Sequence, residues 1–86
     1  MKTYRVLISA SAWRQLMKLG DKAQDKVSDA IYELENQPRP SGCKKLKGEV
    51  NTYRVRVGDF RVLYEIHDDI LVVLVVTIGD RKEVYD

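Results

Sequence analysis

The chain has 86 residues, of which 44% are hydrophobic and 33% are charged, and its formal net charge is +2. This length supports a single domain over residues 1–86 and excludes a second catalytic domain. One cysteine (Cys43) and one histidine (His67) are too few for a disulfide or a structural zinc site, so no metal or cofactor is expected. The longest apolar run, residues 70–76, is far shorter than a membrane span. The sequence therefore predicts a cytoplasmic protein without membrane contact.

The first predicted element is a strand over residues 4–8, which are β-branched, aromatic or leucine apart from one arginine. A helix follows it, because Ser9 and Ser11 are suitable N-cap residues and an apolar stripe continues at helical spacing. Trp13 belongs to this stripe and is predicted to be a core anchor. Gly20 predicts the end of the helix.

A second helix is predicted directly after the first. Asp21 and Gln24 have the spacing of a capping box, and an apolar stripe runs through residues 23–34. The proline- and glycine-rich stretch 36–42 ends this helix. Because the connection at Gly20 is so short, the two helices are expected to form an antiparallel hairpin.

Three further strands are predicted from residue 53 onward. Apolar residues recur at every second position over 53–57 and 60–67, with polar residues between them except at Leu63, and Gly58-Asp59 is a suitable two-residue turn between the two segments. Residues 70–76 are apolar on both faces, which is typical of a central strand covered on both sides. The predicted fold class is α+β in the order β-α-α-β-β-β: an antiparallel sheet with an N-terminal helical hairpin packed on one face.

The predicted hairpin gathers basic residues on one face. Residues 44–61 contain six basic side chains and two acidic ones. With a two-residue turn, Arg56 lies opposite Arg61, and Arg54 shares their face. Like charges directly opposite each other are destabilising by up to about 1 kcal/mol, and the planar guanidinium suits phosphate. A bound anion explains the cluster; the alternative is a solvated face that carries charge without function.

The chain resembles the RelE side of the RelE/ParE superfamily, the small toxins of bacterial and archaeal type II toxin-antitoxin pairs. The resemblance covers nearly the whole chain and depends on five segments taken together. These are WRQLMKL (13–19), PRPSG (38–42), KKLKG (44–48), YRVRVGDFRVLY (53–64) and IGDRKEVY (78–85).

The resemblance implies a metal-independent endoribonuclease that cleaves mRNA in the ribosomal A site and so inhibits translation. It also implies a cognate antitoxin as partner, with operator DNA contacted only through the antitoxin complex. The family's catalytic positions fall on Arg54, Arg56, Arg61, Arg81 and Tyr85, and Lys44, Lys45 and Lys47 are expected to bind RNA. Arginine is not deprotonated in proteins, so the general base stays open, with Tyr85 as a candidate.

Two alternatives follow from the same resemblance. One is a ParE-like inhibitor of DNA gyrase with the same fold, and the other is a catalytically inactive relative that binds an antitoxin.

One geometric requirement also follows, because strict alternation places Arg81 on the face opposite Arg61. The predicted site therefore needs a bulge or a strand end, and Gly79 is the expected place for it.

Overall fold

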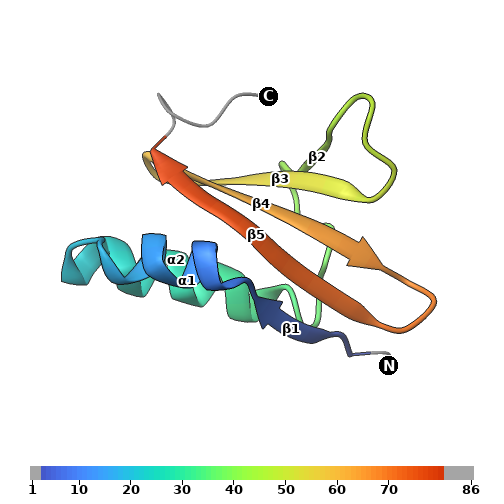
Figure 1. Cartoon of the computed structure of the whole chain (residues 1–86), viewed down its shortest axis with the longest axis horizontal. Helices are drawn as coiled ribbons and strands as arrows, with labels where there is room; N and C mark the ends of the chain where they lie inside the picture. Colours follow the sequence, from blue (N-terminus) through green and yellow to red (C-terminus); the bar gives the residue numbers. More distant parts are fainter. Residues whose placement is uncertain (1–2, 81–86) are drawn as a thin grey trace.

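The computed structural model describes residues 3–80, which form two helices and a five-stranded sheet (Figure 1). The predicted α+β class with N-terminal helices is confirmed. In chain order the elements are β1 (Arg5–Ile8), α1 (Ala10–Met17), α2 (Asp21–Glu33), β2 (Lys44–Lys45), β3 (Thr52–Val57), β4 (Phe60–His67) and β5 (Val72–Asp80). None of the helices in the described part of the chain has the length and apolarity to cross a membrane.

The sheet has the strand order β1-β5-β4-β3-β2 and is mixed. The prediction of an antiparallel sheet is right for β3, β4 and β5 but wrong for β1, which pairs parallel to β5. A parallel pair needs a long connection between its strands, and both helices and the three strands β2, β3 and β4 lie between β1 and β5 in the chain. The short strand β2, which adds an edge next to β3, was not predicted.

The β3–β4 hairpin has the predicted register. Val57 pairs with Phe60, and Arg56 pairs with Arg61. Gly58 has a φ of +59° in the turn between them. Glycine adopts this left-handed conformation without the steric cost that a Cβ brings. The turn therefore fixes which side chains of the two strands share a face.

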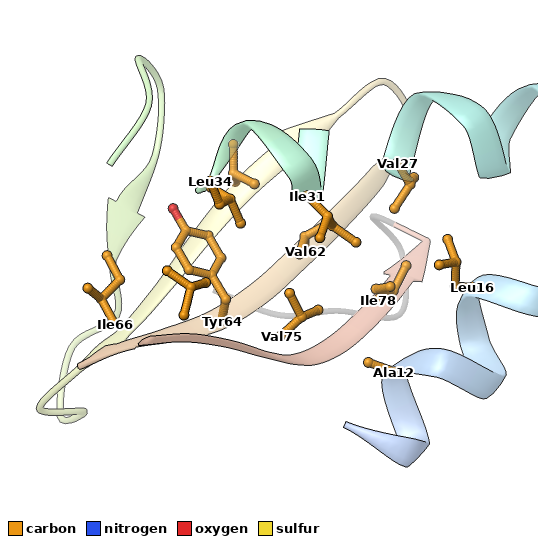
Figure 2. Packing of buried hydrophobic residues seen from close by; sticks show 12 residues of the cluster. Ala12, Leu16, Val27, Ile31, Leu34, Val62, Tyr64, Ile66, Val75 and Ile78 are labelled. Atoms are coloured by element: carbon orange, nitrogen blue, oxygen red, sulfur yellow. The ribbon is translucent and has the colours of Figure 1, made fainter. Parts of the chain in front are cut away.

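Both helices pack on the same face of the sheet, here called the covered face (Figure 2). The helices contribute buried Ala12, Leu16, Val27, Ile31 and Leu34, and the strands contribute Val55, Val62, Tyr64, Ile66, Val73, Val75 and Ile78. The opposite face, here called the open face, has no helix over it among the described residues. The apolar run in β5 is consequently not covered on both sides: Val73 and Val75 are buried, while Val72 and Leu74 are half-buried on the open face.

The helix starts differ from each other in how they are capped. Ser9 caps α1 as predicted, and its Oγ accepts a hydrogen bond from the backbone N–H of Ala12 at 3.0 Å. The capping box predicted for α2 is absent, because the N-cap is Gly20, which has no side chain to accept a bond. Gln24 instead donates from Nε2 to the carbonyl oxygen of Leu16 at 3.1 Å. It therefore ties α2 to the end of α1.

The prediction that Trp13 anchors the core is wrong. Trp13 is 51% exposed and Met17 is 47% exposed, whereas Ala12 and Leu16 are buried. Each exposed residue follows a buried one and lies about 100° further round the helix. The helix α1 therefore turns only the Ala12–Leu16 side of its apolar stripe toward β5, and the rest of the stripe stays exposed.

A polar cluster holds the segment between α2 and β2 against the end of the sheet. Arg39 pairs with Asp68 at 2.8 Å, and its guanidinium carbon lies 5.1 Å from the ring centre of Tyr53. Tyr53 stacks on Tyr64 with 6.1 Å between ring centroids, and the Tyr64 hydroxyl donates to the Pro38 carbonyl at 2.8 Å. Burial, together with nearby Cys43, raises the pKa of Tyr64. The hydroxyl therefore stays protonated as a hydrogen-bond donor.

Candidate functional site

Three arginines lie on the open face of strands β3 and β4. Arg56 and Arg61 occupy directly opposite positions. Arg54 lies two residues earlier on β3, on the same face, and is opposite Leu63. Side chains two residues apart on a strand point to the same side. The structure therefore brings together the three arginines that the sequence analysis assigned to one face.

The three arginines differ in exposure. Arg54 is only 8% exposed, Arg61 is half-buried, and Arg56 is exposed. A charge that is partly removed from water interacts more strongly with an approaching anion than an exposed charge does. Arg54 and Arg61 therefore supply positive charge at the base of the open face. Arg56 supplies an exposed cation that can adjust its position.

The predicted RNA-binding lysines lie beside the arginines of the open face. Lys44 pairs with Arg54 across β2 and β3. Together with Lys45, Leu46, Lys47 and Arg54 it lines a shallow pocket of about 240 Å³. All three lysines are exposed. A two-residue strand has no recognisable sequence pattern, so the contact between Lys44 and Arg54 could not be predicted.

A bulge in β5 reverses the side-chain alternation opposite Leu63 and Tyr64 of β4, two residues beyond Arg61. Leu63 pairs with Thr77 and Tyr64 pairs with Val75, so the ladder bypasses Val76. The predicted irregularity therefore exists, but it lies three residues before Gly79. Gly79 itself is directly opposite Arg61 and places no side chain beside the guanidinium. The predicted catalytic residues Arg81 and Tyr85 lie outside the described residues.

Two further polar side chains share the open face and were not assigned a role from the sequence. His67 is the last residue of β4, and its Nε2 lies 2.9 Å from Oε1 of Glu65. The alternation along β4 could have placed Glu65 and His67 on the same face as Arg61, because residues 61, 63, 65 and 67 share one face. Within residues 3–80, no three or more His, Cys, Asp or Glu side chains are grouped so as to hold a metal ion.

The fold and the open face define a class: a small α+β protein with a cationic sheet surface. The family model described as "ParE toxin of type II toxin-antitoxin system, parDE" matches residues 6–85. Toxin RelE3 of Methanocaldococcus jannaschii is 42% identical over 86 residues, which cover 95% of this chain and 96% of that protein. The mRNA interferase toxin RelE of Escherichia coli (strain K12) is 28% identical over 78 residues, which cover 86% and 81%.

Solved structures agree with these sequence matches. The archaeal RelE-RelB complex from Pyrococcus horikoshii OT3 has a TM-score of 0.84 at 28% identity and covers 95% of this chain and 99% of the matched one. The toxin-antitoxin complex RelBE2 from Mycobacterium tuberculosis has a TM-score of 0.82 at 28% identity and covers 92% and 99%. The chain belongs to the RelE/ParE superfamily of toxins from type II toxin-antitoxin systems, which confirms the resemblance noted in the sequence.

Proposed function

We propose that this toxin is a ribosome-dependent endoribonuclease that cleaves mRNA in the ribosomal A site. The observation that carries the proposal is the placement of Arg54, Arg56 and Arg61 on one open sheet face. The E. coli relative named as an mRNA interferase supports the same activity. The reaction needs no metal or cofactor, because guanidinium groups supply the positive charge that a metal ion supplies in other nucleases.

The proposed chemistry is attack by a ribose 2′-hydroxyl on the neighbouring phosphate. The 2′-hydroxyl gives up its proton to a base, and its oxygen forms the new bond to phosphorus. The bond from phosphorus to the 5′-oxygen breaks, and that oxygen takes up a proton, which leaves a 2′,3′-cyclic phosphate and a 5′-hydroxyl. Negative charge grows on the phosphoryl oxygens in the transition state, where Arg61 stabilises it. Arg54 and Arg56 orient the phosphate by bidentate hydrogen bonds. From the sequence alone, we assign Arg81 to the leaving oxygen, and Tyr85 to base stacking or to proton acceptance.

The lysines have a separate proposed role in binding RNA. Lys44, Lys45 and Lys47 are exposed flexible cations at the β2 edge, away from the Arg56–Arg61 pair. Such side chains neutralise phosphates without reading sequence, and they release counterions on binding. We assign them to ribosomal RNA and not to the reacting phosphate.

We propose a cognate antitoxin as the protein partner. Two of the solved relatives with this fold are toxin-antitoxin complexes, RelE with RelB and RelBE2, and a cationic open face suits an acidic segment that folds on binding. Contact with operator DNA is assigned to the toxin only as part of the antitoxin complex.

Expression in bacteria with and without the adjacent antitoxin gene tests the toxin assignment, and primer extension on translated messages tests the activity. We expect growth arrest, rescue by the antitoxin, and cuts inside A-site codons. Excess chelator should leave cleavage unchanged on ribosomes whose assembly is verified separately. Intact messages with defective DNA supercoiling would instead establish gyrase inhibition, and antitoxin binding without toxicity would establish an inactive relative.

A further inference from the structure

The proposed reaction leaves one pair of polar residues on the open face without a role. Glu65 and His67 are neighbours on the same side of β4, with 2.9 Å between Oε1 and Nε2. Their side chains are 35% and 32% exposed, respectively. Both are accessible to a ligand, and the contact between them holds each in one orientation.

The pair lies in line with the proposed cleavage site. Four residues of β4 separate Glu65 from Arg61, which corresponds to about 13 Å at about 3.3 Å per residue. Stacked nucleotides advance about 3.4 Å each along one strand of a duplex, and extended ones advance further. A single RNA strand therefore spans this distance with about two to four nucleotides.

The surface between the two points is apolar and partly exposed. Leu63 lies between Arg61 and Glu65 on β4, and Leu74 is paired with Glu65 from β5. Both leucines are half-buried. Apolar side chains can pack against the flat face of an unstacked base, while cations at the border hold the phosphates. The open face offers both kinds of surface within one strand length.

The carboxylate within the pair favours a base over a phosphate. Glu65 is itself anionic, and the acidic turn residue Asp68 is already paired with Arg39. A carboxylate repels phosphate but accepts hydrogen bonds from the amino groups of bases. It has about four lone-pair sites, so its contact with His67 does not exhaust its capacity.

We propose that Glu65 and His67 form a base-reading subsite that favours a base with an exocyclic amino group, two to four nucleotides from the cleaved phosphate. Adenine, cytosine and guanine carry such a group, and uracil does not. Glu65 accepts the amino hydrogen bond, and His67 positions Glu65 and contacts the base with its ring. This inference rests on the proposed function, since it deepens the RNA preference of the same face.

Nuclear magnetic resonance tests the inference, because the chain has a single histidine whose ring signals are assigned without ambiguity. The probes are pentanucleotides with 2′-O-methyl groups, which prevent cleavage, and with uridine or cytidine at each position in turn. We expect the His67 ring signals to shift on binding. We also expect one position at which cytidine binds about tenfold more tightly than uridine, equivalent to about 1.4 kcal/mol.

Two variants make the test specific. Glu65→Gln should abolish the preference for cytidine, because its amide can donate to the uracil oxygen as well as accept. Glu33→Gln is the matched control, since it makes the same change at an exposed position on α2 in the helix layer. It should keep the full preference.

The outcomes separate the inference from the proposed function. If the amide signals of Arg56 and Arg61 shift while the His67 ring does not, RNA binds the face and the base-reading subsite is wrong. Equal affinity for cytidine and uridine at every position also overturns it. If no RNA shifts any open-face signal, the proposed function and the subsite both fail. Ring shifts with an acidic peptide alone would assign the pair to a protein interface.

Discussion

Replacing Arg56 with glutamine should stabilise the fold while weakening the site. Arg56 is exposed and lies directly opposite Arg61. Side chains at opposite positions begin about 5 Å apart, and two unit charges about 5.5 Å apart in water repel by about 0.75 kcal/mol. In a domain of this size, 1 kcal/mol shifts the melting temperature by about 4–8 °C. The expected rise is therefore about 3–6 °C at low ionic strength.

Thermal unfolding followed by circular dichroism measures this rise, and salt provides a second check. The screening length falls from about 10 Å at 0.1 M to about 3 Å at 1 M, so the rise should nearly vanish in 1 M salt. Lys26→Gln is the control, because it removes one positive charge from an exposed position on α2. If Arg56→Gln melts no higher than this control at low salt, the two arginines do not repel each other and the argument for a bound anion is refuted.

Two other predictions concern binding and stability. Replacing Lys44, Lys45 and Lys47 together with alanine should flatten the salt dependence of ribosome binding by about one unit of logarithmic slope per lost phosphate contact; an unchanged slope in a salt titration would exclude these lysines from the interface. Tyr64→Phe should lower the free energy of unfolding by about 1–3 kcal/mol, because the buried Pro38 carbonyl loses its donor. Denaturant titration measures this loss, and Tyr32→Phe, at a position 67% exposed, should change stability by less than about 0.5 kcal/mol.

The parts of the fold that were predicted correctly are those set by local periodicity. Alternation over β3 and β4 and the Gly58-Asp59 turn fix the register, and the register alone places Arg56 opposite Arg61. The Ser9 cap was found for the same reason, because its hydrogen bond spans only three residues. Local rules were sufficient wherever the interacting groups are close in sequence.

The errors arose where distant segments decide the structure. The parallel pairing of β1 with β5 depends on contacts nearly seventy residues apart in sequence, and nothing within β1 itself specifies them. Trp13 lies on an apolar stripe, yet the short helix turns only Ala12 and Leu16 fully into the core. The bulge at Val76 lies where the register of β5 against β4 shifts, and that register depends on both strands together. The prediction of a bulge at Gly79 was wrong in position, because a valine can also be the residue that the strand pairing bypasses.

The central claim is that the open-face arginines stabilise the transition state of RNA cleavage, and Arg61→Ala tests it most directly. Single-turnover cleavage of mRNA on saturating ribosomes should slow by about 10²–10³, as expected for loss of one positioned donor to a developing oxyanion. The affinity for the ribosome, measured separately, should change little. If Arg61→Ala cleaves at the wild-type rate under these conditions, the arginine site is wrong and the cluster is a charged surface without a catalytic role.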